Sequence, residues 1–254
     1  AGENEVSTAF NGQKVTVVST VQETEDRKFD GWEVTRAPAG FTISADKLKQ
    51  KEFSFIMPAG DVELTAHHSN RLEVSGGTAE VNGNAVDFAR PGAAVSVTAA
   101  DRSAEGYQFD HWVVSGGDIG KSGDDLKANP LTINNMPDAA VKLTAVYRAA
   151  VKVSNGTAQV GTESGETVYA LEGETVTVTG HDSNASFSKF VGWKLKKGSL
   201  TKITGADGIS LNVTVDAENG YLLDDAGEKI KNETFTFTMQ GKPVELSAVY
   251  SIPA

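Results

Sequence analysis

The chain has 254 residues, a formal net charge of −11 at pH 7 and no cysteine. Nucleic-acid binding draws its affinity from clustered Lys and Arg, so this acidic balance excludes nucleic acid as an expected partner. Without cysteine there is no disulfide, no Cys-based zinc site and no thiol nucleophile. No run of about 18 apolar residues is present, so we expect no membrane insertion within this sequence, and its first residues lack the pattern of a signal peptide.

The first 69 residues predict a small β module. Residues 13–17 and 62–66 alternate apolar and polar side chains and are rich in β-branched types, which is typical of strands with one buried face. Residues 53–55 form a third run of this kind, and residues 44–50 are expected to form a short helical turn. Few residues precede Gly12, so the opening strand of this copy is expected to be truncated, or reduced to a stub at residues 5–9.

The same order of anchor residues returns twice further along the chain, which marks an internal repeat. Each of three glycines lies 20 residues before a tryptophan, and each tryptophan lies three residues after a phenylalanine. Each methionine lies nine residues before an alanine, and these are all the tryptophans and methionines of the chain. One buried aromatic cluster per copy would nucleate each core, so we favour a core role over sugar stacking for the tryptophans. The predicted core residues are Phe29, Trp32 and Met57, then Phe109, Trp112 and Met136, then Phe190, Trp193 and Met239.

The second and third copies add features that the first lacks. Residues 72–74 and 151–153 read as opening strands, followed by Gly-Gly or Asn-Gly turn signals. The third copy is also longer, since Met239 lies 46 positions after Trp193, against 25 and 24 for the other two pairs. The surplus lies near residues 199–231, where a second alternating run and an Asn-Gly pair predict an extra hairpin.

These patterns predict a mainly β fold of three tandem modules, which are β-grasp-like or small sandwich-like. The boundaries are residues 1–69, 70–148 and 149–254, and the third module carries the hairpin insertion. Only a few residues separate Ala66 from Leu72, or Ala145 from Val151, so we expect semi-rigid joints between modules.

The ordered set of motifs resembles the divergent internalin B-type repeat, also called the Listeria–Bacteroides repeat. It runs from glycine through V-x-V and aromatic-x-x-Trp to Phe-x-Phe-x-Met-Pro and V-x-L-x-A-x-Tyr, and it covers nearly the whole chain except the insertion. The resemblance implies a small β-grasp-like fold, no enzymatic activity and no cofactor, and a setting in exported or cell-surface bacterial proteins. The chain departs from the pattern at His67, His68, His111 and Gln240, which affects local turns and surface details.

No motif predicts catalysis or a metal site. His67 and His68 are adjacent and so point to opposite faces of a strand, which is poor geometry for one metal ion. Asp224 and Asp225 lack the spacing of a calcium loop and indicate an ordinary turn. No G-x-S-x-G or phosphate-binding loop is present. A Lys–Asn or Lys–Asp isopeptide crosslink stays open, although alternating faces would expose most of these residues.

Two functions remain from the sequence. The first is a non-catalytic, extracellular spacer or stalk of a larger bacterial surface protein. The second is an adhesion module for a host or bacterial protein or a glycan, because non-repeated loops on a repeat scaffold often carry specificity. The contact residues would then be Tyr221, Leu222, Leu223, Asp224 and Asp225, with extension of the module 3 core as the alternative role of residues 221–223.

Overall fold

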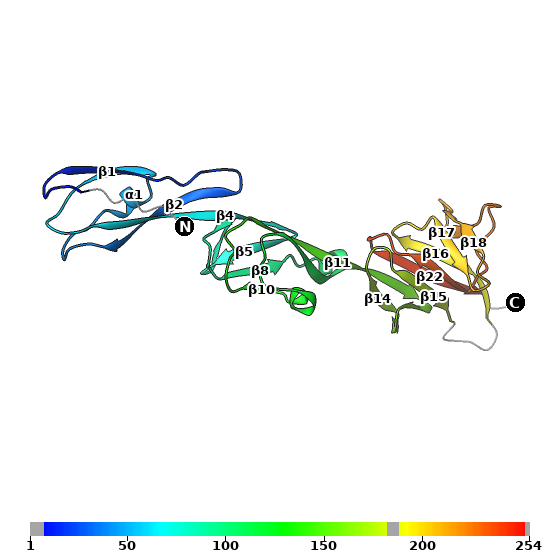
Figure 1. The fold of residues 1–254 in the computed structure, drawn as a ribbon. Coiled ribbons are helices and arrows are strands. Elements are labelled where there is room, and N and C mark those ends of the chain that lie inside the picture. The colour runs from blue at the N-terminus through cyan, green and yellow to red at the C-terminus, as the bar shows by residue number, and fades with distance from the viewer. Residues whose placement is uncertain (1–7, 182–187, 252–254) are drawn as a thin grey trace. The chain divides into compact units, whose positions relative to one another are not determined.

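The computed structural model describes residues 8–181 and 188–251, and it confirms a mainly β chain, with 54% strand and 5% helix. Module 1, module 2 and module 3 denote residues 1–69, 70–148 and 149–254. The chain divides into two compact units, the first formed by Ala1–Ala100 with His111–Ala145 and the second by Asp101–Asp110 with Val146–Ala254. Figure 1 shows the strands in each.

Within residues 8–69, module 1 contains two antiparallel strand pairs and one helical turn, and most of the stub expected at residues 5–9 lies outside the described residues. β1 pairs with β3, so that Val15 lies opposite Phe55 and Val17 opposite Phe53. β2 pairs with β4, and the register shifts between Phe29 and Trp32 at a bulge. The helical turn lies within residues 44–50, where the sequence indicates one. The elements are β1 (Lys14–Val18), β2 (Arg27–Arg36), α1 (Ala45–Leu48), β3 (Glu52–Ile56) and β4 (Glu63–Ser75).

Module 2 repeats this plan and adds an opening segment. β8 corresponds to β1 and lies between β10 and β5 in a four-stranded sheet, whose fourth strand is β6. β9 pairs with β11, as β2 pairs with β4, and β7 pairs with β4. The elements are β5 (Gly77–Val81), β6 (Asn84–Ala85), β7 (Phe88–Ala89), β8 (Val95–Ala99), η1 (Ser103–Glu105), β9 (Tyr107–Gly116), η2 (Gly123–Lys127), β10 (Leu131–Ile133) and β11 (Val141–Ser154).

Module 3 has the same core strands with a larger sheet. Its six-stranded sheet has the order β13-β12-β15-β21-β17-β18, while β16 pairs with β22 and β14 with β11. The insertion supplies the antiparallel pair β17 and β18, which extends the sheet beyond β21, and the short pair β19 and β20. The elements are β12 (Gly156–Val160), β13 (Glu163–Gly165), β14 (Thr167–Ala170), β15 (Thr175–Gly180), β16 (Lys189–Lys197), β17 (Lys202–Gly205), β18 (Ser210–Asn212), β19 (Thr214–Val215), β20 (Leu222–Leu223), β21 (Thr234–Thr238) and β22 (Val244–Ser251).

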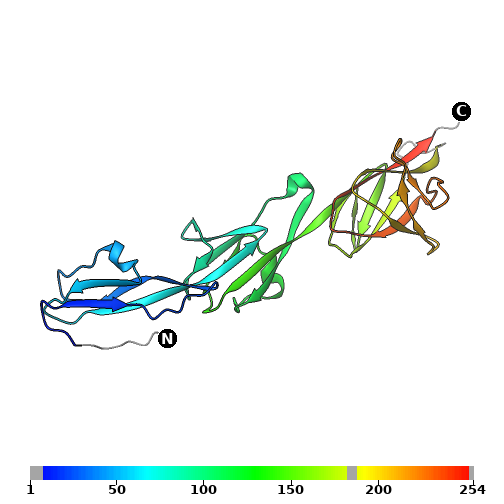
Figure 2. The ribbon, with the colours of Figure 1, turned by 90° about the horizontal axis from the view of Figure 1, so that it is seen from above.

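Two long strands each serve two modules. Residues 63–70 of β4 pair with β2, and residues 72–75 of the same strand pair in parallel with residues 141–144 of β11. Residues 151–154 of β11 then pair in parallel with residues 244–247 of β22. Figure 2 shows β4 as one continuous ribbon through modules 1 and 2. The boundaries expected at 69/70 and 148/149 therefore fall inside strands, because the closing strand of one module is the opening strand of the next.

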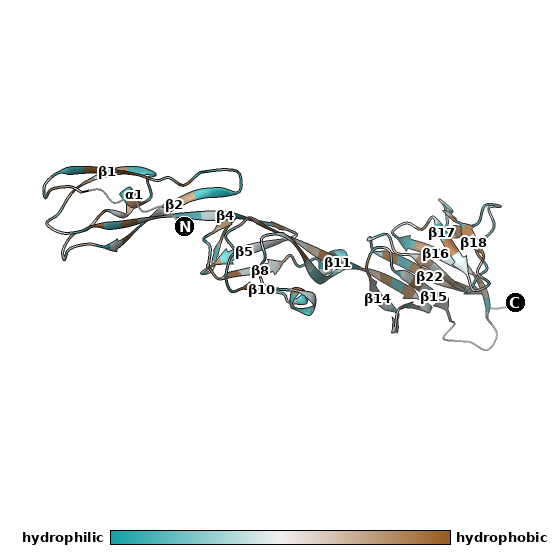
Figure 3. Ribbon diagram, in the orientation of Figure 1, coloured by the Kyte–Doolittle hydropathy of each residue, from teal (hydrophilic) through white to brown (hydrophobic). Residues whose placement is uncertain are grey.

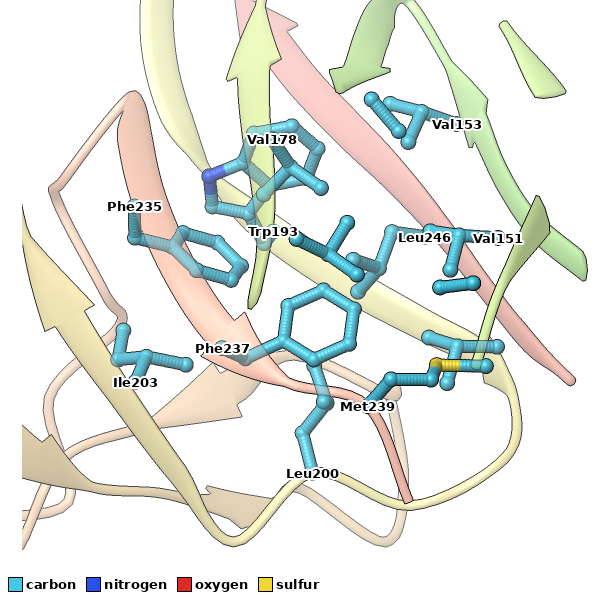
Figure 4. Close-up of a cluster of buried hydrophobic side chains, with 14 of the residues drawn as sticks. Val151, Val153, Val178, Trp193, Leu200, Ile203, Phe235, Phe237, Met239 and Leu246 are labelled. Atoms are coloured by element: carbon cyan, nitrogen blue, oxygen red, sulfur yellow. The ribbon is translucent and has the colours of Figure 1, made fainter. Parts of the chain in front are cut away.

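Hydrophobic and hydrophilic residues alternate along the strands, as the colouring of Figure 3 shows. Trp112 and Trp193 are fully buried, at 0% exposure, whereas Trp32 is only partly buried. In module 3 the Trp193 ring contacts Phe235 edge-on, with ring centroids 5.5 Å apart, among valines and leucines (Figure 4). Met136 and Met239 are buried, and the partly buried residues of the predicted core are Phe29, Met57, Phe109 and Phe190.

Candidate functional site

The predicted contact residues of the insertion do not gather in one exposed patch. Leu222 is fully buried and belongs to the apolar core around Trp193. Its carbonyl oxygen accepts a hydrogen bond from the Ile230 backbone N–H at 3.0 Å, and Ile230 is also buried. Tyr221 and Leu223 are partly buried. Through Leu222 and Ile230, the insertion therefore extends the core of module 3.

The polar residues around Tyr221 engage one another. The Tyr221 ring centroid lies 4.6 Å from Lys194 Nζ and 3.8 Å from Lys229 Nζ, so two ammonium groups contact one aromatic ring. Asp224 forms a turn, because its Oδ1 accepts the backbone N–H groups of Ala226 at 3.0 Å and Glu228 at 2.9 Å. Asp225 Oδ2 accepts a hydrogen bond from Asn212 Nδ2 at 3.2 Å. These bonds hold the local turn.

A second cluster, which the sequence did not reveal, lies where β4 passes from module 1 to module 2 within the first unit. Asp138 Oδ1 accepts hydrogen bonds from His68 Nε2 at 2.7 Å, Arg27 Nη2 at 2.8 Å and Asn70 Nδ2 at 3.0 Å. The hydrogen bond from Asn70 is the main cause, and that from His68 the second, that lowers the pKa of Asp138 to about 2. This carboxylate is therefore ionised near neutral pH. We call these four residues the Asp138 cluster.

The other side of the same junction has its own ion pair. Arg90 of module 2 donates from Nε to the Asp30 carboxylate and from Nη2 to the Asp30 carbonyl at 2.6 Å. Ser69 Oγ donates to the same carboxylate at 2.7 Å. Ser69 and Asn70 are buried at 6% and 2% exposure, so two adjacent polar residues of β4 are desolvated here and both are hydrogen-bonded. Satisfied buried polar groups of this kind fix one arrangement of the neighbouring elements.

The second unit uses the equivalent positions differently. Asp110 occupies the place of Asp30, two residues before the module 2 tryptophan, and Arg148 occupies the place of Ser69. Arg148 Nε donates to Asp110 Oδ1 at 2.6 Å and Nη1 contacts Glu174 Oε2 at 3.3 Å. These contacts raise the pKa of Arg148, mainly through the hydrogen bond to Asp110. In both units, the aspartate two residues before the tryptophan is thus bound by a polar residue of a strand that two modules share.

The histidines of the described residues do not converge on a metal site. His67 contacts Glu33 at 2.7 Å and His68 contacts Asp138, so the two adjacent imidazoles face different carboxylates. Within residues 8–181 and 188–251, no group of three or more histidines and carboxylates could hold a metal ion. The buried polar side chains of these residues are Ser19, Ser69 and Asn70, with no lysine among them.

The junction residues carry a weak sequence signal. Ser69 and Asn70 lie in the polar stretch 67–71, between the alternating runs 62–66 and 72–74, and two small polar residues inside a strand suggest a special role. Nothing in the sequence links them to Asp138, which lies 68 residues after Asn70.

Comparison of the sequence with protein families matches residues 2–72 and residues 70–151 to the Divergent InlB B-repeat domain. Comparison with curated proteins and with solved structures gives no match. Repeats of the matching family are typical of bacterial surface proteins. Among the helices that the structure describes, none is long and apolar enough to cross a bilayer. The two matches meet inside β4, the strand that modules 1 and 2 share, and together they cover more than half of the chain, which therefore belongs to the divergent InlB B-repeat family.

Proposed function

We propose that the chain is a non-catalytic, extracellular spacer that forms part of the stalk of a larger bacterial surface protein. The observation that carries this proposal is the absence of a separate linker between described modules: β4 and β11 each close one module and open the next. A strand resists bending more than a flexible linker does, because its backbone is held by neighbouring strands on its edges.

The parallel pairing of terminal strands supports a load-bearing role. In module 2, the opening residues 72–75 of β4 lie parallel to the closing residues 141–144 of β11. Tension applied through the two ends of the module pulls these strands in opposite directions along their length. Their hydrogen bonds then carry the load together, whereas a hairpin pulled open at one end would lose them one after another. Module 3 has the same arrangement between residues 151–154 and 244–247.

Small-angle scattering of the purified chain tests the proposal. If each module adds about 30–40 Å along strands of typical length, three modules in line reach about 100 Å. The matched control carries a flexible Gly/Ser insertion between Ser69 and Asn70, which separates the shared strand without changing any side chain. We expect the natural chain to give an extended profile with a narrower range of dimensions than the control. A compact profile, or one indistinguishable from the control, would contradict a semi-rigid spacer.

The alternative function is adhesion to a host or bacterial protein or to a glycan through the insertion. The observation that favours it is the exposure of Ile209 and Val215, at 59% and 42%, next to and within strands that only module 3 has. Deleting residues 206–209, with the turn closed by two glycines, would remove Ile209 while leaving the buried Leu222. Loss of cell or glycan-array binding in that variant, with unchanged thermal stability, would favour adhesion over a spacer role.

A further inference from the structure

Module 1 has an open strand edge at a position that the other modules cover. β8 of module 2 pairs with β10 on one side and with β5 on the other, and β15 of module 3 pairs with β21 and with β12. β1 occupies the same place in module 1 but pairs only with β3 among the strands of the described residues. One edge of β1 therefore has no described strand partner.

The backbone of β1 presents alternate hydrogen-bonding groups at this edge. Ser19 N donates to Lys51 O at 2.8 Å, and Gln13 O accepts from Met57 N at 2.8 Å, so the odd-numbered residues of β1 face β3. In an antiparallel ladder the residues between them face the other way. The N–H and C=O groups of Lys14, Thr16 and Val18 consequently point to the open edge. Unpaired groups of this kind form a template for an added strand.

The core beneath this edge is incomplete as well. Val15, Val17 and Trp32 are only partly buried. Their equivalents in module 2 are at most 1% exposed, and those in module 3 are 0% exposed: Val95, Val97 and Trp112, then Val176, Val178 and Trp193. All three modules have valine, valine and tryptophan at these positions. The difference in exposure therefore comes from the strands that cover them.

The closing part of β4 in module 1 shows the same difference. Its equivalents in β11 and β22 pair in parallel with an opening segment, as Val141 does with Leu72 and Val244 with Val151. Val62 and Leu64 have only β2 beside their segment among the described strands and are partly buried. Val141, Leu143, Val244 and Leu246 are buried, at 0–4% exposure. Among the described residues, no strand of module 1 covers these edges of its two sheets.

The segments that cover modules 2 and 3 have nearly the same sequence. Residues 72–81 read LEVSGGTAEV and residues 151–160 read VKVSNGTAQV. The fifth residue turns the chain from one sheet to the other with a positive φ, +78° at Gly76 and +54° at Asn155. The sixth residue must be glycine, because a Cβ on Gly77 would lie 2.4 Å from Thr98 O and 2.8 Å from the Trp112 ring. A Cβ on Gly156 would lie 2.5 Å from Thr179 O.

We propose that module 1 is an acceptor site for the opening segment of another repeat of this kind, with the pattern of residues 151–160. The bound segment adds one strand parallel to residues 62–65, at the start of β4, and one antiparallel to β1, and its glycine lies against Trp32. By equivalence with module 2, the threonine of the segment pairs with Val18 and the residue two places later pairs with Thr16. This site is independent of the spacer role.

Charge at the second position selects between the two known segments. Lys152 lies directly opposite Glu245 in module 3, and Glu73 lies opposite Lys142 in module 2, with a salt bridge of 2.7 Å. The equivalent residue of module 1 is Glu63, which is exposed. Opposite charges directly across a ladder stabilise it and like charges destabilise it. A segment with lysine at its second position, as in residues 151–160, therefore fits module 1 better than one with glutamate.

The test is titration of the full chain, labelled with ¹⁵N, with a synthetic peptide of residues 151–160. The chain has three tryptophans and so gives three indole N–H signals in the spectrum. We expect saturable movement of the Trp32 signal alone, identified with Trp32→Phe. The peptide with Gly156→Val should not bind, and the peptide with Lys152→Glu should bind about two- to fivefold more weakly.

Variants of the acceptor strand supply the matched control. Thr16→Pro removes the N–H that faces the open edge, and proline is tolerated on an edge strand. Thr16→Ala keeps that N–H, and both variants lose the 2.7 Å contact between the Thr16 and Ser54 hydroxyls. We expect Thr16→Pro to lose at least fivefold in peptide affinity and Thr16→Ala to bind as the natural chain does.

A fusion that places residues 151–160 before the chain on a flexible linker raises the effective concentration of the segment into the millimolar range. It should protect Trp32 from acrylamide quenching, and the Gly156→Val fusion should not. The proposal is wrong if neither the free peptide nor the fusion changes Trp32. It is also wrong if the peptide binds only after removal of residues 1–7, or if the chain instead dimerises through β1 and the peptide does not compete.

Discussion

Removal of the Asp138 carboxylate tests whether the shared strand is held by side chains as well as by its ladder. Asp138→Ala takes away the acceptor for Arg27, His68 and Asn70 at once. Of these donors Asn70 matters most, because it is 2% exposed and its remaining acceptor is Pro137 O at 3.4 Å. The variant leaves a buried amide donor with one long hydrogen bond.

The magnitude follows from burial. A buried donor that loses its partner costs about 1–3 kcal/mol. Asp138 itself is 53% exposed, so its ion pair with Arg27 and its hydrogen bond with His68 add only about 0–1 kcal/mol. We expect Asp138→Ala to lower the free energy of unfolding of the first unit by about 2 kcal/mol. Hydrogen exchange of residues 67–72 should also become faster, because the local opening of β4 becomes easier.

Urea unfolding with hydrogen exchange by mass spectrometry measures both effects. Asp61→Ala is the matched control, since Asp61 pairs with Arg36 at 3.4 Å and the two side chains are 77% and 67% exposed. That variant should change the unfolding free energy by no more than about 0.5 kcal/mol. If the two variants prove equal within error, the Asp138 cluster does not stabilise the junction and the ladder alone holds it.

The same carboxylate predicts a pH dependence with a definite sign. The pKa of Asp138 falls to about 2 in the folded chain, from an ordinary value of 3.8, mainly through the hydrogen bond from Asn70. A carboxyl with a depressed folded-state pKa contributes stability above its unfolded value and loses it as the pH falls through the folded value. The natural chain should therefore lose more stability between pH 4 and pH 2 than Asp138→Asn, whose amide does not titrate. Parallel slopes for the two proteins in this window would refute the assignment.

Three further pairs of substitutions test the cores. Trp193→Ala empties a fully buried site and should cost about 3–5 kcal/mol in thermal or urea unfolding, whereas Trp32→Ala should cost less than half as much because Trp32 is partly exposed. Gly77→Ala should cost at least about 1–3 kcal/mol, since its Cβ would overlap Thr98 O, while Gly165→Ala, whose Cβ has its nearest neighbour at 3.7 Å, should be close to neutral. Leu222→Ala should cost about 2–5 kcal/mol if the insertion is part of the module 3 core, and Tyr221→Ala about 1 kcal/mol; the reverse order would favour a surface role for Leu222.

The fold could be predicted from the sequence wherever a residue that recurs in every module has the same structural role in each. Period-two alternation predicted a strand at residues 13–17, and β1 spans Lys14–Val18, because this strand has one face toward its core. The turn residues before Gly77 and Gly156 were also visible, although they redirect the chain between two sheets instead of forming a hairpin. That distinction depends on which strands pair, and the pairing partners lie outside the local sequence.

The junction could not be predicted for the same reason. Sequence spacing showed that Ala66 and Leu72 are close along the chain, yet it could not show that they belong to one strand. His68 reads as a surface residue on its own, and only the fold brings it to within 2.7 Å of Asp138, 70 positions later. The insertion raised a similar ambiguity: Tyr221, Leu222 and Leu223 are three adjacent bulky residues, and their separate environments follow from the Val215–Leu222 pairing in β19 and β20.

A shared strand makes the stability of one module depend on its neighbour. Repeat arrays gain stability from nearest-neighbour contacts as well as from each repeat. β2 pairs with residues 63–70 of β4, and β11 pairs with residues 72–75 of the same strand. If either module opens, one half of β4 loses its partner strand, and the half that stays paired in the other module is held less firmly. Asn70, buried between these halves and bound to Asp138 of module 2, ties the two ladders together. Modules 1 and 2 should accordingly unfold as one cooperative body, which suits a spacer because a single loosened module would lengthen the chain under load.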